Sequence, residues 1–391
     1  MRGATTLDRR RLIGGAAGFA ALGLAGCATS RGPSVYSPPI APIRASLNRL
    51  FDITVCLRPF RAAGPRLDTE QVGSKLVVHN YGHGGSGWSL SWGSAHVALA
   101  KAMQAGPKEI AVIGCGALGL TTATVALQAG VPATIYARDL LPDTRSARAT
   151  GVFTPSSRIA LDKNVAADFP AQWEEMARTT FRTFRSYMGL PGNPVEWTDR
   201  YTLSDLSPEE QRARRAPDPL GFADYSDRIH DLLPNGDTLP PGSTPFPTPY
   251  VHRTPQLMFN LSDYGHTLMS DFFAAGGKLV RAEFATLGDV ARLKERVVIN
   301  CTGYGARALC KDESLVPVRG QTGRLIPQPE VNYALFYNGV TTVPRNDGIV
   351  VQVLTGGDMR GYNDANETVD RAESEDAVTV LAGLFAKFGT V

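Results

Sequence analysis

The sequence predicts an α/β fold, and three features between residues 108 and 138 carry this prediction. Residues 108–114 read as a short buried strand, which runs into the turn Gly114-Cys115-Gly116-Ala117-Leu118-Gly119. A helical stretch follows up to Gln128, and Gly130 ends it. Residues 132–138 then read as a second strand. Strand, glycine-rich turn, helix and strand in this order predict a Rossmann-like unit with a parallel sheet.

The glycines of this turn have the spacing of a dinucleotide-binding site. Gly114 permits the tight turn, and Gly116 lets the backbone approach a pyrophosphate at the helix N-terminus. Gly119 lets the helix pack closely on the strand, while Ala117 and Leu118 open the helix. The alternative is a glycine-rich turn in some other α/β protein, but the flanking elements favour the dinucleotide.

Arg138 and Asp139 stand at the end of the second predicted strand. An acidic residue in this place usually binds the ribose hydroxyls of the adenosine. Asp139 could instead cap the segment that follows it.

Composition indicates a large globular protein. The 391 residues are 43% hydrophobic and 20% charged, which excludes a disordered chain, a collagen or a coiled coil. The formal net charge is +3, and residues 1–26 alone carry it through four arginines and one aspartate. The remaining chain is balanced, so nucleic acid is not an expected partner.

Residues 1–26 resemble an export signal. Arg9-Arg10-Arg11 precede a small apolar run, which is too short to span a bilayer, and the paired arginines resemble a twin-arginine signal. Leu24-Ala25-Gly26-Cys27 resembles a bacterial lipobox, in which Cys27 becomes the lipidated N-terminus. The alternative is a plain signal peptide with a chance cysteine. We expect a lipoprotein of the bacterial cell envelope that faces the periplasm.

The other cysteines and the histidines predict neither a disulfide framework nor a metal site. Cys56, Cys115, Cys301 and Cys310 show no CxxC spacing, and the six histidines show no HxH spacing.

A second glycine-rich turn, Gly82-His83-Gly84-Gly85-Ser86-Gly87, precedes a helical run over residues 88–105. Backbone N–H groups at such a helix N-terminus could hold an anion or the pyrimidine edge of a flavin. The alternative is an ordinary tight turn before a core helix.

Residues 77–95, VVHNYGHGGSGWSLSWGSA, resemble the signature of the D-amino-acid oxidases and D-aspartate oxidases. Upstream, Leu57-Arg58-Pro59-Phe60-Arg61 resembles the strand that supplies the family's substrate arginine. Downstream, weaker resemblances cover Arg138 to Pro155 with Ser146, residues 297–303, Arg319-Gly320-Gln321, and residues 364–391. In ordinary members the signature and the arginine strand lie at the C-terminus. The chain therefore resembles a circular permutant of the family.

The resemblance implies a Rossmann-like FAD-binding domain interleaved with an α+β substrate domain. The expected order is a signal peptide (1–26), a Pro-rich tether (27–50) and a substrate-domain strand (51–71). The FAD domain follows in two parts, 72–162 and 276–310, and the rest of the substrate domain also comes in two parts, 163–275 and 311–391.

It also implies the chemistry. A D-amino acid gives a hydride from Cα to flavin N5, and the products are a 2-oxo acid, ammonia and, with O2, hydrogen peroxide. FAD is expected to be non-covalent, although His83 or Cys56 could lie near the ring.

By resemblance, Arg58 clamps the substrate carboxylate, with Arg61 as its fallback, and the carbonyl of Gly85 takes the amine. The alternative for Arg58 is a surface position on an edge strand. Ser89 matches a hydroxyl that bonds flavin O2, or else a helix N-cap. The further FAD contacts expected are Gly84, Gly87, Ser146, Thr302 and Gly303.

Tyr337 resembles one of two tyrosines that cover the substrate in the family. The second tyrosine falls on Thr341, whose hydroxyl is shorter by a ring. We expect Arg58 to carry more of the clamp, or Tyr333 or Arg345 to help, and the pocket to be wider.

Other functions stay open. One is a related FAD amine oxidase or dehydrogenase for glycine, sarcosine or another N-substituted amino acid, with oxygen or a membrane quinone as acceptor. Another is a flavin-binding lipoprotein without turnover.

Overall fold

Two β-sheets organise the chain in the computed structural model, which describes residues 40–214 and 218–389. From Ile40 onward the residues pack as one compact unit. The predicted signal peptide and Cys27 lie outside the described residues. Within the described ranges, no helix has the length and apolar character needed to cross a membrane.

The first sheet is the predicted Rossmann-like unit. Its strand order is β2-β3-β10-β4-β5-β9, and all neighbours are parallel except β2 and β3. The strands are β2 (Thr69–Val72), β3 (Lys75–His79), β4 (Ile110–Ile113), β5 (Ala133–Ala137), β9 (Lys278–Arg281) and β10 (Val297–Asn300).

Helices α1 (Gly87–Met103), α2 (Ala117–Gln128), α3 (Phe169–Arg185) and α5 (Leu261–Ala274) pack into one apolar core with this sheet. Gly93 permits the close contact of α1 with α3, because a Cβ there would lie 2.3 Å from the backbone of Met176. Three aromatic residues of α3 are buried in this core: Trp173, Phe181 and Phe184.

The second sheet has eight strands in the order β1-β11-β14-β13-β12-β6-β8-β7. Their bounds are β1 (Leu50–Arg61), β6 (Val195–Ser204), β7 (Asp237–Leu239), β8 (Tyr250–Phe259), β11 (Leu315–Leu325), β12 (Tyr333–Tyr337), β13 (Val340–Arg345) and β14 (Gly348–Val353). Helix α8 (Arg371–Phe385) packs its apolar side on one face of this sheet. Because side chains alternate along a strand, Arg58 lies on the other face.

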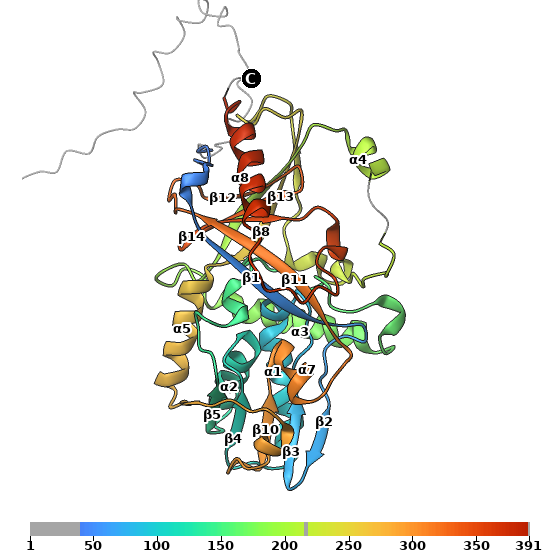
Figure 1. Ribbon diagram of the computed structural model, residues 1–391, viewed down its shortest axis with the longest axis vertical. Coiled ribbons are helices and arrows are strands. Elements are labelled where there is room, and N and C mark those ends of the chain that lie inside the picture. The colour runs from blue at the N-terminus through green and yellow to red at the C-terminus, as the bar shows by residue number, and fades with distance from the viewer. Residues whose placement is uncertain (1–39, 215–217, 390–391) are drawn as a thin grey trace, which may run out of the picture. The chain divides into compact units, whose positions relative to one another are not determined.

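Segments from the start of the described chain complete both sheets. Figure 1 shows the blue strand β1 beside the orange β11, and the blue β3 beside the orange β10. These strands precede the Gly114–Gly119 turn in the chain but pair with strands from its last third. The glycine-rich segment therefore belongs to the same core as the Rossmann-like unit.

Two of the predicted boundaries need correction. The tether predicted for 27–50 cannot extend past residue 39, because Ile43 is 2% exposed and the Tyr333 hydroxyl donates to the carbonyl of Ala41 at 2.7 Å. A short 3-10 turn, Leu47–Arg49, leads from there into β1. Strand β2, whose first residues fall in the predicted substrate-domain segment 51–71, belongs to the six-stranded sheet.

Short elements fill the connections. Helix α4 (Pro208–Arg214) has no buried residue. The segment 233–250 is rich in Pro and Gly and contains the short strand β7. Helices α6 (Leu287–Val290) and α7 (Ala306–Leu309) flank β10.

Candidate active site

A cavity of about 780 Å³ opens where the carboxyl ends of β4, β5 and β10 meet β1. This is the edge at which parallel α/β sheets bind their ligands. Most of the predicted site residues line it: Arg58, Gly84, Gly85, Gly87, Gly114, Gly116, Ala117, Leu118, Arg138, Asp139, Ser146, Thr302 and Gly303.

The Gly114–Gly119 turn forms the floor of the cavity at the N-terminus of α2. Gly114 has φ +103, and a Cβ there would lie 2.6 Å from the carbonyl oxygen of Cys301. A Cβ on Gly116 would lie 2.8 Å from Ser146 Oγ, which accepts the N–H of Ala117 at 3.0 Å. The turn therefore leaves backbone room for a pyrophosphate. Gly119 does not line the cavity; it lies against the carbonyl of Gly114, where no side chain fits.

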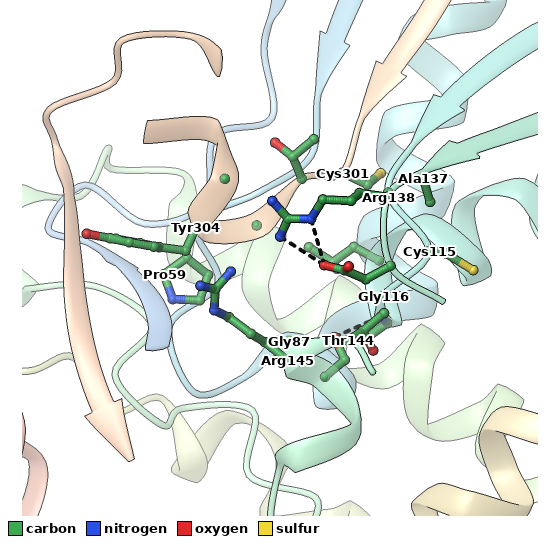
Figure 2. A pocket seen from close by; sticks show the side chains of 18 of the residues that line it. Pro59, Gly87, Cys115, Gly116, Ala137, Arg138, Thr144, Arg145, Cys301 and Tyr304 are labelled. Atoms are coloured by element: carbon green, nitrogen blue, oxygen red, sulfur yellow. Dashed lines mark hydrogen bonds and ion pairs between the residues drawn. The ribbon is translucent and has the colours of Figure 1, made fainter. Parts of the chain in front are cut away.

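Charged residues close the β5 end of the cavity. Asp139 Oδ2 accepts from Arg138 Nη2 at 2.9 Å, and Figure 2 shows Arg138 with its bonds to this carboxylate. Arg138 Nη1 also donates to Glu283 at 3.0 Å. The hydrogen bond from Arg138 lowers the pKa of Asp139, so this carboxylate is ionised and can accept from ribose hydroxyls.

The second glycine-rich turn is held between β1 and the segment around Ser157. The N–H of Gly84 donates to the carbonyl of Pro59 at 2.8 Å, and that of Gly85 donates to the carbonyl of Ser157 at 2.9 Å. Gly84 has φ +54, and a Cβ on it would lie 1.9 Å from the carbonyl oxygen of Arg158. Only glycine fits there, so the turn brings the N-terminus of α1 into the cavity wall.

Arg58 lines the cavity from β1. Its Nη1 donates to the carbonyl of Arg319 at 3.3 Å, and Gly320 gives the guanidinium its space, since a Cβ there would lie 2.2 Å from Nη1. Within the described ranges it has no carboxylate partner. Burial, and next the charge of Arg58, lower the pKa of the neighbouring Arg158 to about 10.

The fallback arginine is not available to a ligand. Arg61 donates to Ser314 Oγ and to the carbonyl of Gly64, and it pairs with Asp312 at 3.4 Å. It is absent from the residues that line the cavity.

Two predicted contacts are not at the cavity. Ser89 is buried in α1, and its hydroxyl accepts the N–H of Thr154 at 2.8 Å. Tyr337 lies on the α8 side of the eight-stranded sheet, opposite Arg58, and its hydroxyl donates to Asp205 at 2.8 Å. The alternation of side chains along β12 separates Tyr337 from the cavity.

The residues expected to replace the missing tyrosine are also engaged elsewhere. Thr341 shares the sheet face of Arg58, but its hydroxyl donates to the carbonyl of Leu335 at 3.1 Å. Tyr333 bonds Ala41 on the opposite face, and Arg345 donates to Asp347 and to the carbonyl of Ala149.

Sequence reasoning missed several lining residues, among them Trp88, Arg145, Arg148, Tyr304 and Glu367. Arg145 pairs with Glu367 and lies over the ring of Tyr304, 6.0 Å from its centroid (Figure 2). The available signal was position: Arg145 and Arg148 follow β5, next to the predicted Ser146, and Trp88 follows Gly87.

The cysteines of the described residues are free thiols. Burial raises the pKa of Cys115 to about 11 and that of Cys301 to about 12, so both stay protonated and inert at neutral pH. In the same ranges, no group of three or more His, Cys, Asp or Glu side chains could hold a metal ion.

The fold and the cavity define a class: a Rossmann-like protein with a site shaped for a dinucleotide at the carboxyl edge of its parallel sheet. The sequence from residue 109 to 391 matches the family model "DAO: FAD dependent oxidoreductase", which is more than half of the chain. The chain belongs to this family of FAD-dependent oxidoreductases. Strands β1, β2 and β3 and helix α1 lie before the matched residues.

Similar proteins include D-amino acid oxidases. That of Dugesia ryukyuensis is 25% identical over 293 residues, which cover 71% of this chain and 78% of the relative. That of Dictyostelium discoideum is 26% identical over 303 residues, covering 71% and 74%. Among solved structures, glycine oxidase from Geobacillus kaustophilus has a TM-score of 0.48 at 16% identity, over 72% of this chain and 77% of that one.

The buried imidazole of His83 predicts a loss of stability in acid. Burial lowers its pKa from 6.5 to about 3 in the folded protein. Below about pH 6.5 this imidazole is protonated in the unfolded chain but stays neutral in the folded protein. The free energy of unfolding therefore keeps its full value from His83 above about pH 6.5. It decreases as the pH falls towards 3, by up to about 1.4 kcal/mol per pH unit.

Urea unfolding of the apoprotein at pH 7 and pH 5 measures this effect. His83→Gln should lose less stability than the unmodified chain between the two pH values. His230→Gln, at an exposed position, is the matched control and should behave as the unmodified chain does. Equal losses in all three proteins would show that other groups cause the acid instability.

Proposed function

We propose that the protein is an FAD-dependent oxidase that deaminates D-amino acids. FAD dependence and the amine-oxidising type of chemistry follow from family membership; the D-amino acid is the further step. The observation that carries it is Arg58, a guanidinium without a carboxylate partner among the described residues, beside the Gly82–Gly87 turn in the cavity wall. Similarity to D-amino acid oxidases supports the same substrate class.

Each residue has one task in this reaction. Arg58 binds the substrate carboxylate through its planar fork of N–H donors. The carbonyl of Gly85 accepts an N–H of the amine, and together with the carboxylate contact this orients the single Cα–H bond of the D-enantiomer towards the cofactor. Bound FAD would supply the hydride acceptor and, in an oxidase, the route for the electrons to O2. The imine is then hydrolysed to the 2-oxo acid and ammonia.

The test is anaerobic mixing of the purified yellow protein with D-amino acids and with their L-enantiomers. Bleaching of the flavin by D-forms alone, with peroxide on readmission of air, is the expected result.

Arg58→Met should keep its FAD but weaken substrate binding by roughly 100-fold, because it loses a charge-assisted pair worth about 3 kcal/mol. Arg61→Met is the control and should keep normal substrate affinity.

The loss of a tyrosine at Thr341 favours a second candidate, a related amine. A protein that only glycine, sarcosine or another N-substituted amino acid bleaches would contradict the D-amino acid assignment. Slow reoxidation by air with fast reoxidation by a quinone analogue would identify a dehydrogenase.

We further infer that the chain is circularly permuted relative to its family. Contacts of α8 with β1 and with the turn before it support this, because in the family a helix precedes the arginine strand. Residues 108–389 joined by a Gly-Ser linker to residues 40–106 should fold and bind FAD. A reordered chain that stays soluble and unfolded would contradict the inference.

We also propose that Cys27 is lipidated and tethers the domain to the bacterial envelope. The lipobox and the twin-arginine motif support this. Mass spectrometry of protein from the membrane fraction should find acyl chains on an N-terminal Cys27, and Cys27→Ser should move the protein to the soluble fraction. An N-terminus at any other residue would refute the anchor.

A further inference from the structure

The four arginines that line the cavity fall into two kinds. Arg138 is neutralised by Asp139 and Glu283, and Arg145 by Glu367. Arg58 and Arg148 have no carboxylate partner in the described part of the chain. Both lie at the β1 end of the cavity, whereas Arg138 and Asp139 follow β5.

Arg148 is fixed in place by the backbone around it. Its Nη1 donates to the carbonyl of Val55 on β1 at 3.0 Å. Two residues earlier, the carbonyl of Ser146 accepts from Trp88 Nε1 at 2.8 Å, and Trp88 is in the first turn of α1. Arg148 therefore belongs to a short turn that is pinned on one side to β1 and on the other to the N-terminus of α1.

The charges of the cavity leave this cation uncompensated. Three of the four carboxylates that line the cavity pair with Arg138 or Arg145, and the fourth, Asp143, is exposed. Arg148 itself is half-buried. A half-buried arginine that lines a cavity and has no carboxylate partner among the described residues is suited to an anionic ligand.

Two groups of FAD could be the ligand of Arg148: the pyrophosphate, and the flavin ring, which becomes anionic when it is reduced. The pyrophosphate belongs at the N-terminus of α2, where Gly114 and Gly116 leave room for it. Arg148 is instead bonded to β1, the strand that also carries Arg58. The flavin ring, at the opposite end of the cofactor from the adenosine, is the group that belongs at this end of the cavity.

We propose that the guanidinium of Arg148, together with the N-terminus of α1, stabilises the negative charge that two-electron reduction would leave on the pyrimidine side of the flavin. Arg58 is left to bind the substrate carboxylate. The proposal rests on the flavin chemistry of the proposed function, but not on which amine is oxidised. It makes Arg148 a residue that sets the flavin's reduction potential.

The experiment compares the holoprotein with Arg148→Met, with Arg148→Lys, and with the double variant Arg145→Met, Glu367→Gln. The double variant is the matched control, because it removes a cavity arginine without changing the net charge. The midpoint potential is measured against a reference dye, and binding of sulfite, which leaves the ring anionic, is measured by loss of the flavin absorbance. FAD affinity is measured on the apoproteins.

Arg148→Met should bind sulfite at least tenfold more weakly and have a lower potential, by about 30 mV for a tenfold change in a two-electron equilibrium. Arg148→Lys should recover most of the potential, and the double variant should keep it. A potential unchanged in Arg148→Met, together with weakened FAD binding, would assign Arg148 to the pyrophosphate and overturn the proposal.

The two proposals fail separately. If no D-amino acid bleaches the flavin, the D-amino acid assignment is wrong. The effect of Arg148 on the midpoint potential is still measured, because the dye titration needs no amino acid. A potential that falls equally in the double variant and in Arg148→Met would refute the specific role of Arg148.

Discussion

The backbone contact between the Gly82–Gly87 turn and the edge of β1 is the constraint on which the site depends. Gly84 donates to Pro59, and Gly85 donates to Ser157. The first of these bonds connects the turn after β3, in the six-stranded sheet, to β1, in the eight-stranded sheet, and the second connects the same turn to the segment around Ser157. Because a Cβ at Gly84 would overlap a carbonyl oxygen, the contact exists only with glycine there. It places the N-terminus of α1 and the guanidinium of Arg58 on adjoining walls of one cavity.

The parts of the site that sequence alone could predict are those in which backbone geometry dictates residue type. Gly114, Gly116 and Gly119 predict a turn and a close helix contact, and the structure has both. The fold class could be predicted from the order of strand, glycine-rich turn, helix and strand around these glycines. The buried strands could also be predicted, and the helical spacing of Trp173, Phe181 and Phe184 is that of one buried face, which is where the structure has them.

The rest could not be predicted because it depends on which face of a strand a side chain takes in three dimensions. Tyr337 is one residue out of phase with the face that carries Arg58, and a shift of one residue moves a side chain across the sheet. Arg148 follows no motif at all. Its position is fixed by bonds to Val55 and, through Ser146, to Trp88, which are distant in sequence.

The order of elements has a consequence for when the site can form. Strand β1 pairs with β11 in a register that joins Arg58 to Val318, and β3 pairs with β10. Neither sheet can form completely until β10 and β11, in the last third of the chain, pair with β3 and β1. Pairing between segments so far apart in the sequence is slow. A cavity assembled only at the end of folding can take up FAD only once the whole chain is present. A route that exports proteins already folded, which the paired arginines of the leader predict, suits a chain with this order.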